Sequence, residues 1–296
     1  MEPPLPPTKT LHRPPYPFIL PTNPSNSQKD RIIIITGASL GLGEAAAKVW
    51  ARAEAKGIAI AARNLDALNK LAEELKIISP STKVLAVKTD VSDEEDVKNL
   101  FVEIQKTFGR AADVLLNNAA ILEDSEIVDT SVDKWWKTME INLKGVYSMT
   151  HHFINYQPNP KESTATVINV CSGRAGFTTA AGSAYNISKL AQQRFTEHLQ
   201  IELPNLRVFT TMPGIVPTAM QQEAFRPFAK DHADLTGMQA LYLVQPRADF
   251  LKGSMVCVNW DVEELEEHKE EILQKKALMT GWMQVLPLCG GKGLGA

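Results

Sequence analysis

Short apolar runs rich in β-branched residues alternate along the chain with longer segments in which apolar residues recur at helical spacing. This alternation is typical of βαβ units, in which helices join parallel strands. The predicted strands are residues 31–36, 57–62, 83–88, 113–117, 166–171, 207–212 and 255–259, and the predicted helices are residues 44–55, 65–78, 94–108, 132–156 and 184–203. The pattern predicts an α/β fold, a single doubly wound domain with a central seven-stranded parallel sheet flanked by helices.

Both ends of the chain depart from this pattern. Nine of the 18 prolines lie before residue 25, where fixed φ angles and missing N–H donors exclude helix and sheet. Residues 1–29 are therefore predicted to be a Pro-rich extended arm, whose apolar stretch 16–20 either docks on the domain or remains loose. The domain itself spans residues 30–260, and residues 261–296 form a C-terminal amphipathic helix, 261–276, followed by a Gly-rich tail.

Composition and charge exclude several classes of function. The net charge of -3 gives no basic surface for nucleic acid, so no nucleic-acid partner is expected. No apolar run reaches the roughly 20 residues of a membrane span, and no signal sequence opens the chain, so no membrane partner is expected. The cysteines, Cys171, Cys257 and Cys289, are too scattered for a disulfide framework, which favours a reducing compartment and a cytoplasmic location. The histidines show no ligand spacing, so no metal is expected.

A glycine-rich turn follows the first predicted strand. Residues 36–43 read Thr-Gly-Ala-Ser-Leu-Gly-Leu-Gly and lead into a predicted helix. A strand, a tight turn and a helix N-terminus bring backbone N–H groups and the positive end of the helix dipole close to a pyrophosphate. Gly37 permits the turn, Gly41 leaves room for the phosphates, and Gly43 allows the helix to pack closely on the strand. No Gly-Lys-Ser/Thr follows, so the turn predicts a Rossmann-type dinucleotide site and not a nucleoside triphosphate cradle.

The spacing of this turn resembles the cofactor loop of the classical short-chain dehydrogenase/reductase family. Further motifs of that family follow in order: Asp90-Val91, Asn117-Asn118-Ala119-Ala120, Asn142, Ser172, Tyr-Asn-Ile-Ser-Lys at 185–189, and Pro-Gly-Ile-Val-Pro-Thr at 213–218. The match covers residues 30 to 260, and six ordered motifs are far more specific than one glycine turn. The resemblance implies an oxidoreductase that interconverts a carbonyl and an alcohol of a small-molecule substrate.

Four polar residues form the candidate catalytic group. Tyr185 and Lys189 are four apart on a predicted helix and share one face, so the lysine cation is expected to lower the pKa of the phenol. The resemblance implies that Tyr185 exchanges the proton with the substrate, that Lys189 binds the nicotinamide ribose, and that Ser172 donates to the substrate oxygen. Asn142 completes the tetrad and would help to hold a water that relays protons. Cys171, beside Ser172, is interpreted as a packing residue.

Cofactor preference depends on the end of the second predicted strand. The segment Ala61-Ala62-Arg63-Asn64 lacks the carboxylate that binds the ribose 2′-hydroxyl of NAD, whereas a guanidinium can pair with a 2′-phosphate, so NADP(H) is expected. Arg63 could alternatively be a solvated residue at the start of a helix. The resemblance implies that Asp90 and Val91 flank the adenine and that Asn117 holds the adenosine ribose. The full set of predicted cofactor-binding residues is Gly37, Ser39, Leu40, Gly41, Leu42, Gly43, Arg63, Asn64, Asp90, Val91, Asn117, Ala119, Tyr185, Lys189, Pro213, Gly214, Val216 and Thr218.

The rim of the pocket and the assembly are less defined by the sequence. Residues 219–237 are either a substrate lid or part of the core, and the later apolar residues cover either a substrate or a partner subunit. The apolar residues in question within the segment 219–237 are Met220, Phe225 and Phe228. The later apolar residues in question are Trp282, Met283 and Leu286. Trp135 and Trp136 suit core or interface packing. The resemblance implies a homodimer or homotetramer, assembled through the helices that carry Asn142 and Tyr185.

Two departures from the family pattern also bear on function. The last strand leads into Asn259-Trp260-Asp261 in place of the usual Asp-Gly-Gly type of ending, and the Pro-rich arm is additional. Together they resemble fungal members of the family, many of which act in secondary metabolism or detoxification. The sequence therefore predicts NADP(H)-dependent carbonyl reduction or alcohol oxidation. The alternative is a catalytically silent nucleotide-binding or scaffold protein of the same fold, which usually lacks part of the tetrad.

Overall fold

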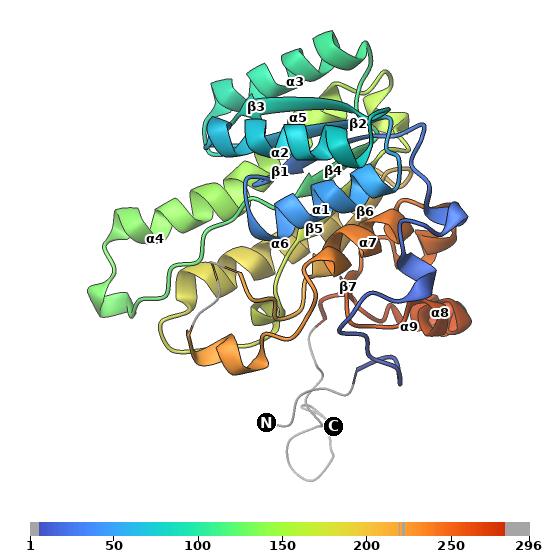
Figure 1. Cartoon of the computed structure of the whole chain (residues 1–296). Coiled ribbons are helices and arrows are strands. Elements are labelled where there is room, and N and C mark those ends of the chain that lie inside the picture. Colours follow the sequence, from blue (N-terminus) through green and yellow to red (C-terminus); the bar gives the residue numbers. More distant parts are fainter. Residues whose placement is uncertain (1–5, 219, 221–222, 282–296) are drawn as a thin grey trace.

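A computed structural model describes residues 6–218, 220 and 223–281 of the chain (Figure 1). Seven parallel strands form one sheet in the order β3-β2-β1-β4-β5-β6-β7. The strands are β1 (Ile32–Thr36), β2 (Gly57–Ala62), β3 (Lys83–Lys88), β4 (Val114–Asn117), β5 (Thr166–Val170), β6 (Arg207–Met212) and β7 (Met255–Cys257). The order reverses direction between β1 and β4, which is the topological switch of a doubly wound sheet. The predicted fold class is confirmed.

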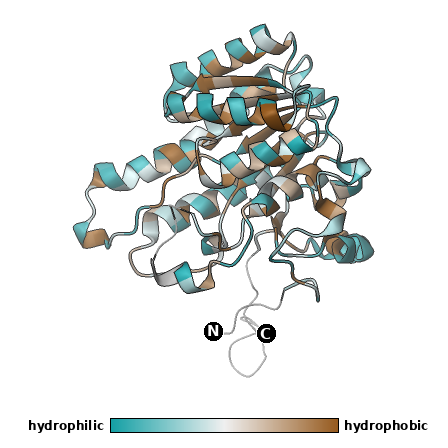
Figure 2. Cartoon of the chain, in the orientation of Figure 1, coloured by the Kyte–Doolittle hydropathy of each residue, from teal (hydrophilic) through white to brown (hydrophobic). Residues whose placement is uncertain are grey.

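Helices cover both faces of the sheet. The first face carries α1 (Gly41–Arg52), α2 (Leu65–Ile78) and α7 (Asp234–Leu243), and the second carries α3 (Glu94–Phe108), α5 (Gly145–Asn155) and α6 (Ser183–Glu202). Along β1, Ile33 and Ile35 join the core under the first face while Ile32 and Ile34 join the core under the second, because successive side chains of a strand point to opposite sides. Figure 2 shows the resulting hydrophobic strands between helices whose outer faces are hydrophilic.

Three helices differ from the sequence prediction. The first begins at Gly41 and not at residue 44, directly after the glycine turn. The long segment 132–156 is α4 (Val132–Met139), a π-helical turn (Glu140–Lys144) and α5, and a π turn carries an extra residue that changes which side chains face inward. The predicted helix 261–276 is two helices, α8 (Val262–Glu267) and α9 (Lys269–Lys275), separated by His268 in a non-helical conformation. Among the residues that the structure describes, no helix is both long and apolar enough to cross a bilayer.

The described part of the N-terminal arm is docked on the domain and not loose. Tyr16 and Ile19 are 6% and 1% exposed and belong to the core under the first face of the sheet. Two short 3₁₀ turns, η1 (Pro17–Ile19) and η2 (Pro24–Asn26), shape the arm, and the Asn26 amide donates to the carbonyls of Phe18 and Leu20. Burial of the apolar side chains therefore offsets the ordering of a proline-rich segment that lacks regular structure.

Polar contacts fasten the arm to the start of α8. His12 Nε2 lies 2.6 Å from Asp261 Oδ2, and the His12 ring stacks on Tyr16 at a centroid distance of 3.6 Å. Asp261 Oδ1 also accepts the backbone N–H groups of Glu263 and Glu264, which caps α8. Burial by itself would raise the pKa of Asp261, but the hydrogen bond to His12 and the backbone donors hold it below its usual range.

The depressed pKa of Asp261 predicts that the arm contact weakens in acid. A carboxyl whose folded-state pKa lies below its unfolded value contributes its full stability above about pH 4 and loses it as the pH falls through the folded-state pKa. Asp261→Asn keeps a capping oxygen but removes the charge opposite His12. We expect this variant to lose about 1 kcal/mol of unfolding free energy at neutral pH and to lose stability less steeply in acid than the wild type, as measured by urea unfolding.

Asp93 provides a matched control, because it caps α3 by accepting the N–H groups of Glu95 and Asp96. Asp93→Asn tests the loss of a capping charge alone. If Asp261→Asn and Asp93→Asn gave the same dependence of unfolding free energy on pH, the pairing with His12 would contribute nothing.

Candidate active site

A cavity of about 760 Å³ opens at the carboxyl edge of the sheet, beside the switch between β1 and β4. Ligands of doubly wound proteins bind in this position because the loops that leave neighbouring strands diverge there. Every catalytic and cofactor-binding residue predicted from the sequence lines the cavity, with the exception of Gly43, Asn117 and Asn142, which lie behind its wall. The topology thus gathers residues that are distant along the chain around one elongated space.

The glycine turn has the conformation that its sequence predicts. Gly37 and Gly41 have φ of +64° and +60°, in the left-handed region that favours glycine. A Cβ on Gly37 would lie 2.8 Å from the Cα of Ala119, and a Cβ on Gly43 would lie 2.5 Å from the carbonyl oxygen of Gly37. Gly43 therefore fits the packing role expected for it, and the absence of side chains leaves a cradle at the N-terminus of α1 that fits a pyrophosphate.

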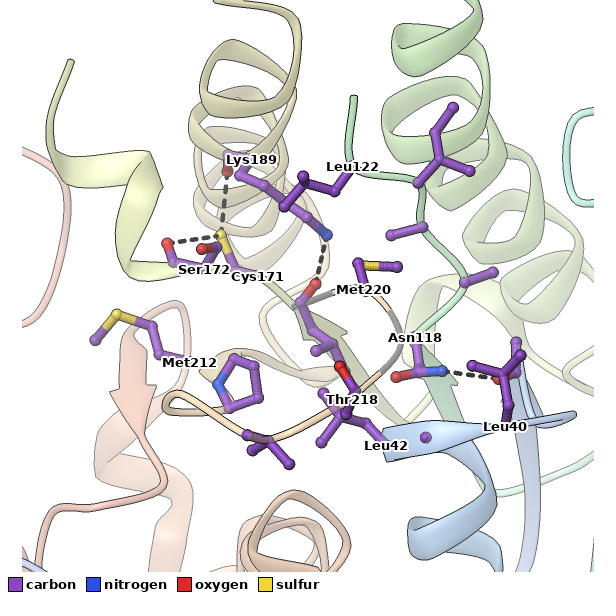
Figure 3. Close-up of a pocket in the computed structure, with 18 of the residues that line it drawn as sticks. Leu40, Leu42, Asn118, Leu122, Cys171, Ser172, Lys189, Met212, Thr218 and Met220 are labelled. Atoms are coloured by element: carbon purple, nitrogen blue, oxygen red, sulfur yellow. Dashed lines mark hydrogen bonds between the residues drawn. The ribbon is translucent and has the colours of Figure 1, made fainter. Parts of the chain in front are cut away.

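Asn118 holds this turn against β4. Its Nδ2 donates to the carbonyl oxygens of Thr36 and Gly37 at 2.9 and 3.2 Å, and the Thr36 hydroxyl accepts the N–H groups of Asn118 and Ala119. Figure 3 shows the Asn118 side chain directed toward the glycine turn. Asn118 lies in a motif that the sequence analysis quoted, but it was not among the predicted site residues.

Asn117, by contrast, does not face the cavity as expected. Its amide is buried and donates to Thr150 Oγ1 at 3.1 Å and to Asn169 Oδ1 at 2.9 Å. Successive residues of a strand point to opposite sides, so Asn118 and not Asn117 is directed at the glycine turn. The side chain of Asn117 ties β4 to β5 and α5, and in this structure it is not placed to contact a ribose.

Ser172, Tyr185 and Lys189 meet on one wall of the cavity. Ser172 lies two residues after the end of β5, while Tyr185 and Lys189 lie on consecutive turns of α6. A side-chain hydrogen bond joins Ser172 to Tyr185 and favours the phenolate. The Lys189 ammonium lies 5.8 Å from the centroid of the Tyr185 ring and donates to the carbonyl of Val170 at 2.8 Å (Figure 3). The predicted grouping of these three side chains is therefore present.

The electrostatics of the group differ from the expectation that Lys189 lowers the pKa of the phenol. Burial raises the pKa of Tyr185 to about 12, and the hydrogen bond from Ser172 only partly opposes it. Burial also lowers the pKa of Lys189 to about 8. The physical reason is that removal from water disfavours every charged form, the phenolate and the ammonium alike. The Lys189 ammonium donates to a backbone carbonyl and to Gln192, and the cation whose charge lowers the pKa of the phenol is Arg174.

Asn142 lies in the π-helical turn and supports the loop that follows β4. Its Oδ1 accepts the N–H of Ile121 and its Nδ2 donates to the carbonyl of Ile121, both at 2.9 Å. A further bond of 3.1 Å reaches the hydroxyl of Ser188, next to Lys189. Asn142 thus connects the wall of the cavity to α6 from behind.

Cys171 is a buried residue at the end of β5, as interpreted from the sequence. Its thiol donates to the carbonyl of Lys189 at 3.2 Å, and burial raises its pKa. Both observations favour a packing role, because a reactive thiol needs its thiolate stabilised.

The far end of the cavity carries the residues expected at the adenosine. Arg63 is exposed at the end of β2, and Asn64 caps α2 by accepting the N–H of Ala67 at 3.1 Å. Asp90 accepts the hydroxyl of Ser92 at 2.6 Å. Burial would raise the pKa of Asp90, but the bonds from Ser92 and the charges of Lys137 and Arg63 hold it below its usual range. This end of the cavity therefore combines the exposed guanidinium of Arg63 with the N-terminus of α2.

Two arginines that were not predicted from the sequence also line the cavity. Arg13, in the arm, lines the cavity and donates to Asp231 at 3.1 Å, and Asp231 in turn accepts the N–H of Ile215 at 2.6 Å. Arg174 lies beside Tyr185. Neither could be found from a local motif, because their partners are distant in the sequence.

The expected lid is only partly lid-like. Met220 lines the cavity and is 41% exposed, and Phe228, at the end of η7 (Glu223–Phe228), is 59% exposed. Residues 234–237, however, open α7, and Leu235, Thr236 and Gly237 are buried, so this end of the segment belongs to the core. The side chain of Phe225 lies outside the part of the chain that the structure describes, as do Trp282, Met283 and Leu286.

The two tryptophans of α4 occupy different surroundings. Trp135 donates to the hydroxyl of Ser183 at 3.1 Å, at the start of α6, and Trp136 is 55% exposed. The first therefore packs within the domain, and the second remains open to an interface.

The sheet topology, the glycine cradle and the Ser-Tyr-Lys wall around one cavity are the features of a dinucleotide-binding α/β protein. The family model described as short chain dehydrogenase matches residues 31–227. The chain belongs to this family. Its members are oxidoreductases that use a nicotinamide cofactor, and the cradle and cavity described above fit such a group.

Curated relatives and solved structures agree with this assignment. The chain is 34% identical to the short chain dehydrogenase mpl6 of Monascus purpureus, over 89% of this chain and 91% of the relative. It is 31% identical to the short chain dehydrogenase pigC of Monascus ruber, over 90% of each chain. A dehydrogenase/reductase from Sinorhizobium meliloti superposes with a TM-score of 0.72 at 21% identity, over 79% of this chain and 95% of that one. Levodione reductase gives 0.71 at 22% identity, over 78% and 97%. These structures share the fold.

Proposed function

We propose that the protein is an NADP(H)-dependent oxidoreductase that interconverts a carbonyl and an alcohol. The observation that carries the proposal is the meeting of Ser172, Tyr185 and Lys189 on the wall of the cavity that also contains the glycine cradle. The named relatives in Monascus support a fungal setting, and secondary metabolism is the role we propose by analogy. We also propose a cytoplasmic location, on the cysteine usage of the sequence.

The chemistry divides between the cofactor and the residues of the chain. The nicotinamide, when bound, supplies or accepts the hydride. Tyr185 gives its hydroxyl proton to the substrate oxygen in reduction and takes it back in oxidation, and Ser172 donates to the same oxygen as charge develops there. A phenol whose pKa is raised to about 12 stays protonated at neutral pH, which suits the donor in reduction. Lys189 would bind the nicotinamide ribose, and Asn142 would help to hold the proton-relay water.

The preference for NADP(H) is supported by the end of β2. Arg63 lines the cavity with Asn64 at the N-terminus of α2, so an incoming 2′-phosphate would meet a guanidinium and the positive end of a helix dipole. The segment from Ala61 to Asn64 has no carboxylate to bind a ribose 2′-hydroxyl. Asp90 and Val91 line the cavity nearby, where the family resemblance places the adenine.

Tyr185→Phe tests the enzymatic proposal against the alternative of a silent nucleotide-binding protein. We expect the wild type to oxidise NADPH with members of a ketone and aldehyde panel. The variant should lose roughly 10²- to 10⁴-fold in kcat, because it lacks the proton donor, and should retain cofactor binding. NADPH oxidation is followed by absorbance and binding by calorimetry. A wild type that binds NADPH but turns over no carbonyl or alcohol on a broad panel would support the silent protein.

Arg63→Ala tests the cofactor preference. Removal of a charge-assisted pair should raise the Kd for NADPH roughly 10- to 100-fold and leave the Kd for NADH nearly unchanged. Arg110→Ala is the control, because Arg110 pairs with Asp113 at the opposite edge of the sheet. Equal losses for NADPH and NADH in Arg63→Ala would remove the argument from phosphate pairing.

Assembly into a homodimer or homotetramer is also part of the proposal. Helices α5 and α6 present exposed apolar side chains, among them Tyr147 at 55% and Ile187 at 46%, and the Tyr147 ring lies 5.9 Å from that of Phe195. Tyr147→Glu should therefore shift the mass in solution toward the monomer, as measured by sedimentation, because a buried unpaired carboxylate is unfavourable. Ile77→Glu, on the exposed side of α2, should not. A monomeric wild type would contradict the proposal.

A further inference from the structure

Arg174 is a buried cation at the centre of the catalytic wall. It lies in a short 3₁₀ helix, η6 (Gly173–Gly176), two residues after Ser172, and is 9% exposed. Its Nη1 and Nη2 donate to the two carboxylate oxygens of Asp124 at 3.0 and 2.9 Å, and its Nε donates to Asn186 Oδ1 at 2.8 Å. A bidentate pair of this kind fixes both the position and the plane of the guanidinium.

The same residue contacts both sides of the proposed proton-transfer pair. Its backbone N–H donates to Ser172 Oγ at 3.2 Å, and its side chain binds Asn186, the residue after Tyr185. The guanidinium carbon lies 5.2 Å from the centroid of the Tyr185 ring, closer than the 5.8 Å of the Lys189 ammonium. A Cβ on Gly182 would lie 2.5 Å from Arg174 Nη2, so the turn that begins α6 is built around this group.

We propose that Arg174 is a positioning residue for Tyr185 and Ser172, and that its charge, held by Asp124, favours the phenolate form of Tyr185 during proton transfer. The inference rests on the proposed function, because it assumes that Tyr185 exchanges a proton with the substrate. Arg174 acts through the ring and the helix that it contacts.

The charges around Tyr185 support this role. The groups that face it are Ser172, Cys171, Lys189, Arg174 and Asp124. Burial raises the pKa of Tyr185 most, the Ser172 hydrogen bond and the Arg174 charge lower it, and Cys171 and Asp124 raise it. Because a cation beside a phenol favours the phenolate, loss of Arg174 should raise the pKa of Tyr185.

The test compares kcat for alcohol oxidation as a function of pH in the wild type, Arg174→Met and Arg174→Lys. In oxidation the phenolate of Tyr185 must accept a proton, so kcat rises as the pH approaches its pKa from below. Arg174→Met should move this rise to higher pH by about one unit and lower kcat at neutral pH at least ~10-fold. Arg174→Lys keeps the charge but loses the bidentate pair with Asp124. Compared with Arg174→Met, it should bring the pH of the rise back toward the wild-type value more completely than it restores kcat. The Kd for NADP should stay within about twofold in both.

Arg207→Met is the matched control. Arg207 forms a comparable two-nitrogen pair with Asp249, at the start of β6 and away from the cavity. If Arg174→Met lowered kcat without moving the pH of the rise, or if Arg207→Met gave the same shift, Arg174 would be only structural and the inference would be wrong.

A second measurement separates this inference from the proposed function. The ζ-carbon NMR resonance of Tyr185, in protein made with isotope-labelled tyrosine and assigned with Tyr185→Phe, reports the environment and ionisation of the ring without turnover. In Arg174→Met this resonance should shift and its ionisation should begin at higher pH. An unchanged resonance would overturn the role of Arg174 even if the enzyme were inactive on every substrate, whereas an inactive wild type with the expected shift would overturn only the proposed function.

Discussion

The hydrogen bonds that close the end of β1 onto β4 are the constraint on which the site depends. The side chain of each of Thr36 and Asn118 forms hydrogen bonds with the backbone of the other. These bonds hold the glycine turn against the loop after β4. The turn can approach that closely only because Gly37 and Gly43 have no side chains. Since the sheet reverses its order at this point, the loops diverge on either side and leave the cavity between them. The cradle and the cavity wall that carries Ser172, Tyr185 and Lys189 both adjoin this junction.

Burial then sets the electrostatics of the catalytic wall. Tyr185 and Lys189 are 6% and 2% exposed, and removal from water opposes the charged form of each. A phenolate at this position therefore needs compensation from fixed neighbours, and the structure provides the Ser172 hydrogen bond and the Arg174 charge. The guanidinium of Arg174 is in turn paired with Asp124, whose carboxylate accepts hydrogen bonds from both of its terminal nitrogens. The pair works as a unit, since Asp124 compensates the charge of a guanidinium that is only 9% exposed.

Local patterns predicted much of this molecule, and non-local pairings account for what they missed. The strands were predictable because buried parallel strands are continuous apolar runs, and the glycine turn because its spacing is tied to backbone geometry. The choice between Asn117 and Asn118 depends on which face of β4 meets the glycine turn, which no periodicity reveals. Arg174 was missed because its partner Asp124 lies 50 residues away. The long predicted helix is divided into α4, a π turn and α5, and helix propensity did not predict this division. The π turn places Asn142 against Ile121, which is a contact between residues distant in the sequence.

The arm explains the unusual Asn-Trp-Asp ending after β7. Asn259 donates to the carbonyl of His12 at 2.7 Å, Trp260 forms an antiparallel bridge with Leu11, and Asp261 binds His12. Each residue of the ending thus has its partner in the arm. Asn259 also donates to Asp231, which accepts the N–H of Ile215 in the loop after β6 that carries predicted cofactor-binding residues. A chain without the arm would leave the half-buried amide of Asn259 and the buried carboxylate of Asp261 short of partners beside that loop, which is costly. The arm and the ending therefore form one structural unit that completes this side of the cavity.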